Sequence, residues 1–351
     1  MLPRLTVHLA TIGQNVRTVT GLCTSHGLRV CGVTKVACGC RQIGAAMAEG
    51  GVDMLADSHP ENLAHLEGLG PDRWMIRIPS ASEAADVVAH AEGSLNSDVA
   101  TLWALEREAA RQGRRHQVIL MLDLGDLREG FWREEDLLRA AKEVREHMPH
   151  LSLRGVGVNL TCFSFVQAET SKLERLVAVS RELGLETPLV SGGNSATLDL
   201  MLRGGVPEGV THLRLGESLL FGRERARYRY LPGTRNDAFI LSAEVVECRT
   251  KPSMPQGTIG RDSYGVQPTF VDRGPRLKAI CNVGKQSIDA ETMWPVEPGV
   301  EILGASSDHL MVDVTELGHP LAAGDRLEFR LGYFATMRAF TSPFVERVFV
   351  E

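Results

Sequence analysis

Short apolar segments alternate with longer amphipathic segments from residue 28 to about residue 220. The amphipathic segments, such as residues 135–147 and 170–183, carry apolar residues at helical spacing, whereas the short segments have the length of buried strands. This alternation predicts an α/β fold with a parallel sheet, and eight units predict that the sheet closes into a (β/α)8 TIM barrel. An open doubly wound sheet is the alternative, but no Gly-x-Gly-x-x-Gly follows the first strand. The expected strands are residues 28–34, 53–56, 74–78, 98–102, 117–122, 153–159, 188–190 and 212–215.

The pattern changes after residue 222. A polar, arginine-rich segment, residues 223–230, is followed by Leu231-Pro-Gly-Thr234, which is typical of a linker. Beyond it, segments with β-type alternation are separated by Gly, Pro and Asp turns, and no long helix is expected. We therefore predict a barrel domain over residues 1–225 and a C-terminal all-β domain over residues 226–351. The strands expected in the second domain are residues 239–248, 276–281, 300–303, 310–314, 326–331 and 345–350.

Composition narrows the class of protein. The chain has 351 residues, of which 43% are hydrophobic and 23% charged, as in ordinary globular proteins. A net charge of −6 argues against a nucleic-acid partner. No apolar segment is long enough to span a bilayer, and the N-terminus lacks a signal peptide's apolar core, so no membrane association is expected. Seven scattered cysteines, an odd number, suit a reduced, cytoplasmic compartment. No metal site is expected, because no second Cys/His pair accompanies Cys38 and Cys40.

Lys35 directly follows the first predicted strand, at the position where barrels carry catalytic groups. A solvated lysine would explain this residue if it stood alone. Other polar residues, however, also follow predicted strands: Arg128, Asn159, the segment Ser191-Gly-Gly-Asn194-Ser195 and the segment Arg214-Leu-Gly216-Glu217. The loops after the last two strands commonly bind phosphate in this fold, although Ser195 alone would also fit an ordinary helix N-cap. A lysine amine near a phosphate site predicts pyridoxal 5'-phosphate (PLP), held as a Schiff base.

Several short motifs support this interpretation through their order and spacing. They are Val33-Thr-Lys35, Met54–Ser58, Ser191–Ala196, Arg214-Leu-Gly216, Ser263-Tyr264-Gly265, Ser307–Asp313 and Gly332-Tyr333. On these motifs, which span residues 33–333, the chain resembles the alanine racemase-type (fold type III) PLP-dependent family, and within it the alanine/ornithine racemase branch.

The resemblance implies roles for individual residues. Lys35 would hold PLP covalently, and the phosphate and ring would be bound by Asn159, Ser191, Asn194, Ser195, Gly216, Glu217 and Tyr333. Arg214 would meet the pyridine nitrogen. Because an arginine cannot accept a proton, this contact disfavours prolonged electron delocalisation and ranks racemisation above transamination.

Racemisation needs a base on each face of Cα. The resemblance implies Lys35 on one face and, on the other, Tyr264 from the β-domain of the neighbouring subunit, so that a homodimer shares its active sites. Arg128 would bind the substrate carboxylate as a fork. Ser307 and Asp308 would lie near the substrate, although Asp308 would also fit a simple turn before a strand.

Two positions depart from the family pattern and bear on the substrate. Asn159 stands where the alanine racemases carry a histidine, and Gly39 where they carry a tyrosine. A pocket opened by Gly39 and flanked by Asp308 could hold a longer, cationic side chain, which favours ornithine, lysine or arginine.

Three other functions stay open. An alanine or broad-specificity racemase would use the same machinery. A fold type III decarboxylase would also fit the domain plan, but it typically has a carboxylate where this chain has Arg214. A non-catalytic PLP-homeostasis protein resembles the barrel alone, so the β-domain and Tyr264 count against it.

Overall fold

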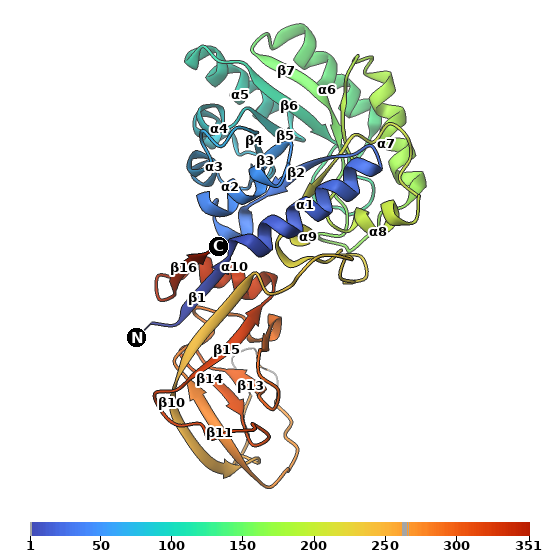
Figure 1. Ribbon diagram of the computed structural model, residues 1–351. Coiled ribbons are helices and arrows are strands. Elements are labelled where there is room, and N and C mark those ends of the chain that lie inside the picture. The colour runs from blue at the N-terminus through green and yellow to red at the C-terminus, as the bar shows by residue number, and fades with distance from the viewer. Residues whose placement is uncertain (1, 262–264, 266) are drawn as a thin grey trace. The chain divides into compact units, whose positions relative to one another are not determined.

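The computed structural model describes residues 2–261, 265 and 267–351 (Figure 1). They form two compact units: residues 8–238, called here the barrel unit, and residues 2–7 together with residues 239–350, called here the strand unit. Residues 226–238 therefore group with the barrel. In the described part of the chain, no helix is long and apolar enough to cross a membrane.

The barrel unit contains a closed parallel sheet in which each strand pairs with the next, and β9 pairs with β2. Its strands are β2 (Arg29–Val33), β3 (Met54–Asp57), β4 (Asp72–Met75), β5 (Gly93–Asn96), β6 (His116–Met121), β7 (Leu151–Gly157), β8 (Leu189–Ser191) and β9 (His212–Leu215). Its helices are α1 (Leu9–Ser25), α2 (Arg41–Glu49), α3 (Pro60–His65), α4 (Ala84–His90), α5 (Val99–Gln112), α6 (Glu134–His147), α7 (Thr170–Glu182), α8 (Thr197–Leu202) and α9 (Glu217–Phe221). Short 3-10 turns are η1 (Lys35–Ala37) and η2 (Ala81–Glu83). The predicted (β/α)8 barrel is confirmed.

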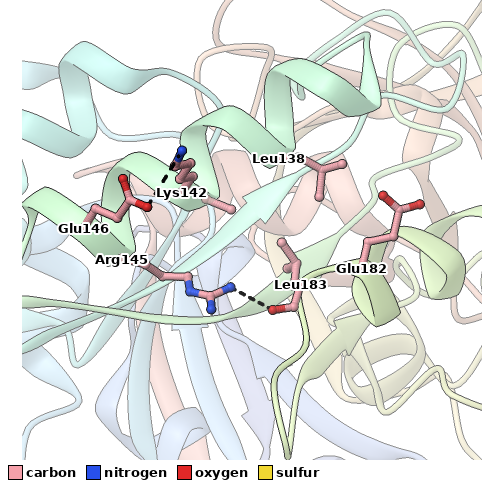
Figure 2. A pocket seen from close by; sticks show the side chains of 7 residues that line it. Leu138, Lys142, Arg145, Glu146, Glu182 and Leu183 are labelled. Carbon is pink, nitrogen blue, oxygen red and sulfur yellow. Dashed lines mark hydrogen bonds and ion pairs between the residues drawn. The ribbon is translucent and has the colours of Figure 1, made fainter.

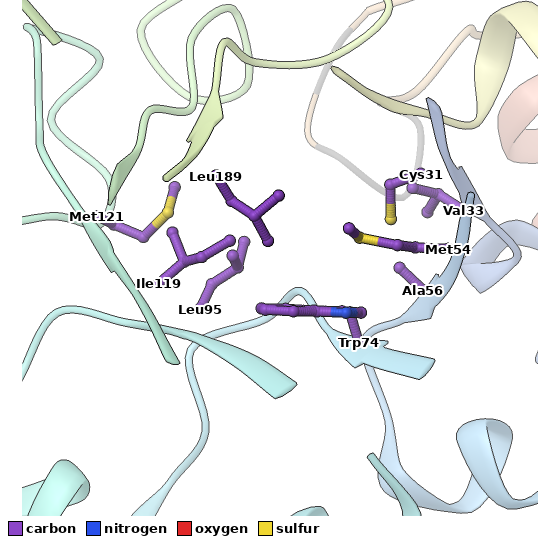
Figure 3. Close-up of a cluster of buried hydrophobic side chains, with 9 residues drawn as sticks. All are labelled: Cys31, Val33, Met54, Ala56, Trp74, Leu95, Ile119, Met121 and Leu189. Carbon is purple, nitrogen blue, oxygen red and sulfur yellow. The ribbon is translucent and has the colours of Figure 1, made fainter. Parts of the chain in front are cut away.

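Apolar side chains from the barrel strands pack together, as Figure 3 shows. Trp74 of β4 is 2% exposed and lies against the neighbouring strand β5. A Cβ at Gly93 would come within 2.7 Å of the Trp74 ring, so β5 has a glycine where the indole needs space. The cluster comprises Cys31, Val33, Met54, Ala56, Trp74, Leu95, Ile119, Met121 and Leu189.

One predicted barrel strand is wrong. Residues 98–102 do not form a strand but begin α5, where the Asp98 side chain accepts a hydrogen bond from the Thr101 N–H at 3.1 Å as an N-cap. The strand at this place in the barrel is β5, Gly93–Asn96, which lies just before it. The helix is favoured by the aspartate at the N-cap and by apolar residues at helical spacing, because Leu102, Leu105 and Ala109 are all buried on one face.

The strand unit is built on antiparallel pairs with the strand order β12-β15-β10-β11-β14-β13, and β1 pairs with both β10 and β16. The predicted all-β domain is confirmed, and the structure adds the N-terminal strand β1, the short strand β12, the 3-10 turn η3 and the nine-residue helix α10. Its elements are β1 (Arg4–His8), β10 (Phe239–Pro252), β11 (Pro275–Cys281), η3 (Ala290–Thr292), β12 (Met293–Pro295), β13 (Glu301–Ala305), β14 (Leu310–Asp313), β15 (Arg326–Leu331), α10 (Tyr333–Thr341) and β16 (Glu346–Val350).

Candidate active site

Lys35 begins the 3-10 turn η1 immediately beyond the carboxyl end of β2. The residue before it, Thr34, is fully buried and donates a hydrogen bond from Oγ1 to Asp57 Oδ2 at 2.7 Å. The other oxygen of Asp57 accepts from the Ser58 N–H at 2.7 Å and from Asn62 Nδ2 at 2.8 Å. The backbone that carries Lys35 is therefore fixed to the end of the neighbouring strand β3.

Lys35 lines a cavity of about 420 Å³, and its side chain is accessible to solvent there. Protein atoms crowd the amine, and this desolvation lowers the pKa of Lys35; the guanidinium groups of Arg128 and Arg225 act in the same direction. A larger share of neutral amine makes Lys35 a better nucleophile than a surface lysine. The cavity is lined by Lys35, Ser58, Ile76, Arg77, Ile78, Arg128 and Glu129.

Arg128 shares the cavity with Lys35, as its predicted role requires. In the structure, its guanidinium fork engages both carboxylate oxygens of the adjacent Glu129. The Glu129 side chain is 13% exposed, and sequence reasoning missed it. The other arginine of the cavity, Arg77, is paired with Glu83 at 2.6 Å.

Arg214 lies buried in β9, where its guanidinium donates to Ser191 Oγ and, at 2.8 Å, to the Val158 carbonyl. Burial lowers the pKa of Arg214, but an arginine stays protonated in proteins. Ser191, predicted as a cofactor contact, is thus a direct partner of Arg214. The two hydrogen bonds fix the guanidinium as a donor among the strand ends.

Asn159 and Asn194, both predicted as cofactor contacts, lie next to each other at neighbouring strand ends. Asn194 Nδ2 donates to the Leu160 carbonyl at 2.8 Å and lies 3.3 Å from Asn159 Oδ1. Cys162 Sγ contacts the same Asn159 oxygen at 3.5 Å. The Asn159 Nδ2 group is buried and has no hydrogen-bond partner among the described residues.

Ser195 and the start of α9 adjoin each other at the ends of β8 and β9. Ser195 Oγ accepts a hydrogen bond from the Ser218 N–H at 3.2 Å and lies 3.2 Å from Ser218 Oγ. Gly216 is the N-cap of α9 and packs on Val33 of β2. The carboxylate of Glu217 is bound by Arg223 at 2.6 Å, so its backbone N–H, rather than its side chain, remains for an anion.

Arg225 is a further residue of this region, and the sequence predicted no site role for it because it lies in the polar, arginine-rich segment 223–230. Its N–H donates to the Ser195 carbonyl at 3.2 Å, and its Nε is buried without a hydrogen-bond partner among the described residues. The loop around it is held by Glu224, which is 1% exposed and accepts backbone hydrogen bonds from Ala226, Arg227 and Arg229. The arginine-rich composition of residues 223–230 was the available signal.

The position where the family has a tyrosine leaves no room for a side chain. Gly39 has a φ of 62°, and a Cβ there would lie 2.4 Å from the Asn62 carbonyl oxygen. Gly39 is not among the described residues that line the Lys35 cavity, so the pocket expected beside it stays a prediction.

The remaining predicted residues belong to the strand unit, so their place relative to Lys35 stays a prediction. Ser307 and Asp308 are exposed and line a cavity of about 270 Å³ within that unit. Tyr333 is the first residue of α10 and is half-buried, with its ring centroid 5.5 Å from that of Phe334. Tyr264 lies outside the described residues.

A separate hollow of about 560 Å³ lies between α6 and the end of α7 (Figure 2). Arg145 of α6 donates to the Leu183 carbonyl at 2.9 Å, and Lys142 pairs with Glu146 at 3.9 Å. This hollow contains none of the predicted site residues.

Within the described ranges, no group of three or more His, Cys, Asp or Glu residues could hold a metal ion.

Comparisons with known proteins agree with this geometry. Residues 7–224 match the family described as "Alanine racemase, N-terminal domain". The chain is 40% identical over 351 residues to an ornithine racemase from Acetoanaerobium sticklandii, covering 99% of each chain, and 35% identical over 353 residues to a lysine racemase from Thermotoga maritima, covering 99% of this chain and 98% of the other. An alanine racemase from Bartonella henselae, solved with covalently bound pyridoxal phosphate, shares the fold over 100% of both chains with a TM-score of 0.73 at 16% identity. The chain belongs to the alanine racemase family.

Proposed function

We propose that this protein is a PLP-dependent amino-acid racemase whose substrate is a basic amino acid, with ornithine the first candidate. One observation carries the proposal. A lysine with a lowered pKa stands at the end of the first barrel strand, in one cavity with an arginine, in a chain that is 40% identical to an ornithine racemase. The lysine racemase at 35% identity supports the same substrate class.

The residues present fit PLP, as the buried hydrogen-bond donors show. Asn159 Nδ2 and Arg225 Nε are buried donors without partners among the described residues, and a donor in that state is costly unless a ligand satisfies it. Arg225 adjoins Ser195, where a phosphate is expected. An amine, a buried guanidinium and orphan donors match an anionic, carbonyl-bearing cofactor.

The residues that would hold PLP follow from these positions. Lys35 would bind it covalently, Arg214 would donate to the ring nitrogen, and Ser195 with the N–H groups of Gly216 and Glu217 would bind the phosphate. Tyr333 would add a contact from the strand unit. When bound, the cofactor withdraws electrons from the substrate amino group and so makes the Cα–H acidic.

Residues of the chain itself transfer the proton at Cα of the substrate. Lys35 removes or returns the proton on one face of Cα, and Tyr264 of the partner subunit serves the opposite face. Arg128 holds the substrate carboxylate, which fixes the orientation of the Cα–H bond. Arg214 can donate but not accept a proton, and this favours return of the proton to Cα over transamination.

A homodimer is part of the proposal. Exposed apolar side chains gather on the loops after β6 and β7: Leu127, Trp132, Phe163 and Phe165 are each more than 60% exposed. Asp126, 1% exposed, holds the second loop in place by accepting backbone hydrogen bonds from residues 162–164 and 166. Fixed, exposed aromatic residues favour a protein partner, and a second copy would also supply Tyr264.

The scattered cysteines favour the cytoplasm as the compartment of the protein.

The test is conversion of L-ornithine by the purified protein with added PLP, followed by chiral chromatography. We expect D-ornithine to accumulate until both enantiomers are equal, with no release of carbon dioxide. Release of carbon dioxide and putrescine would favour the decarboxylase instead. The Lys35→Ala variant should lose both covalent PLP and conversion, and conversion that survives this change would contradict the proposed role of Lys35.

A further inference from the structure

The Lys35 cavity contains one acidic side chain among its described lining residues, and no role is assigned to it. Glu129 follows Arg128 directly, and its side chain is 13% exposed. Its carboxylate is engaged by the Arg128 fork. Two isoleucines, Ile76 and Ile78, line the same cavity and provide an apolar wall.

We propose that Glu129 binds the distal cationic group of the substrate and thereby selects basic over neutral amino acids. The inference rests on the proposed racemase function and deepens it by naming the residue that sets the substrate class. A basic amino acid has an α-carboxylate, an aliphatic stem and a distal ammonium. The cavity offers a partner to each: Arg128, the two isoleucines and Glu129.

The internal ion pair explains how a neutral amino acid is rejected. When the α-carboxylate takes the Arg128 fork, Glu129 loses its partner. The distal ammonium of ornithine or lysine replaces that partner, so one charged pair is exchanged for two and no charge is left unpaired. A neutral side chain of the same length offers no replacement and leaves a mostly buried carboxylate unpaired, which is strongly unfavourable.

Other acidic residues near the cavity are already committed. Glu83 is bound by Arg77 at 2.6 Å and by the Ser80 hydroxyl at 2.6 Å, and it does not line the cavity. Asp57 is fully buried and accepts hydrogen bonds from Thr34, Ser58 and Asn62. Neither carboxylate is available to a substrate, whereas Glu129 is released by the same event that binds the α-carboxylate.

The experiment compares L-ornithine with L-norvaline, which has the same carbon chain without the ammonium. Racemisation of both is measured for the wild-type holoenzyme and for Glu129→Gln, with KM and kcat determined separately. Binding of both amino acids is also measured by calorimetry, so that the comparison does not depend on turnover. We expect wild type to prefer ornithine and Glu129→Gln to lower that preference by roughly 100-fold, mainly through KM and binding.

The controls separate selection from other roles. Glu83→Gln removes the carboxylate of the comparable Arg77 pair and should leave the ornithine-to-norvaline ratio unchanged. An unchanged ratio in Glu129→Gln would overturn the proposal, as would an equal loss on both amino acids, which would make Glu129 a positioning residue for Arg128. A lowered ratio in Asp308→Asn but not in Glu129→Gln would assign selection to Asp308. If the protein racemises neither amino acid but its binding still discriminates between ornithine and norvaline in a way that depends on Glu129, the result would contradict the proposed function while supporting this inference.

Discussion

Replacement of Arg225 by methionine tests the site most directly, because the structure gives this residue no other task for its Nε. The Arg225 N–H contacts the Ser195 carbonyl at 3.2 Å through the backbone, so the substitution keeps that contact. The loop itself is held by Glu224 and not by the Arg225 side chain. The variant therefore removes a cation beside the expected phosphate and leaves the loop in place.

The magnitude follows from the type of contact. A hydrogen bond between a guanidinium and a phosphate is worth about 1.5–3 kcal/mol, and a factor of ten in affinity corresponds to about 1.4 kcal/mol. We therefore expect Arg225→Met to weaken PLP binding by roughly 10- to 150-fold. The effect should be absent for pyridoxal, which has the same aldehyde and ring but no phosphate.

The assay is equilibrium titration of the apoenzyme with PLP and, separately, with pyridoxal, followed by absorbance of the covalent product with Lys35. Arg227→Met is the matched control, because Arg227 is an exposed arginine of the same loop and pairs with Asp199 at 3.5 Å. Its PLP affinity should match wild type. Equal losses for PLP and pyridoxal in Arg225→Met would refute a phosphate contact.

Three further predictions concern stability and assembly. Asp57→Ala leaves the Thr34, Asn62 and backbone donors unpaired, so urea denaturation should show about 3–5 kcal/mol less stability, and a loss below about 1 kcal/mol would contradict this. Burial lowers the pKa of His116 to about 4 and of His212 to about 3, so only the unfolded chain binds these protons just below its own pKa of about 6.5. The contribution of both histidines to the free energy of unfolding is complete above about pH 6.5. It should fall as the pH drops toward their folded pKa values, by up to about 1.4 kcal/mol per pH unit for each histidine. The His116→Gln variant should flatten this slope, and an unaltered slope would speak against the assignment. Changing Phe163 and Phe165 to serine should weaken the dimer at least about tenfold in sedimentation experiments without unfolding the protein, and an unchanged mass distribution would argue against these loops as the interface.

The fold was largely predictable because the barrel strands are apolar and regularly spaced. The exception is β5, whose sequence Gly93-Ser-Leu-Asn96 has little β-propensity. It is a strand because its neighbour Trp74 packs over Gly93, a tertiary contact that local pattern does not reveal. The following residues, 98–102, contain β-branched side chains and resemble a strand until Asp98 is recognised as an N-cap.

The sequence could place candidate residues that lie at or just beyond a strand end, as with Lys35 after β2, Ser195 after β8 and Arg214 near the end of β9, whereas their roles stay predictions. Arg225 was missed because its contact with Ser195 is made by the backbone and joins residues that are distant in sequence. Glu129 was missed because a charged pair on adjacent residues is usually a solvated surface feature. Its meaning comes from the cavity that both Arg128 and Glu129 line.

The pairing of β1 with β10 has a consequence for how the chain is made. Val7 lies opposite Phe239, so β1 is translated before the whole barrel unit and its partner β10 after it. Until then, β1 is an unpaired edge, open to mispairing with other chains. Synthesis that stops after residue 238 would release a barrel unit with the edge of β1 still exposed, and the strands β10 and β16 therefore also protect β1 from such mispairing.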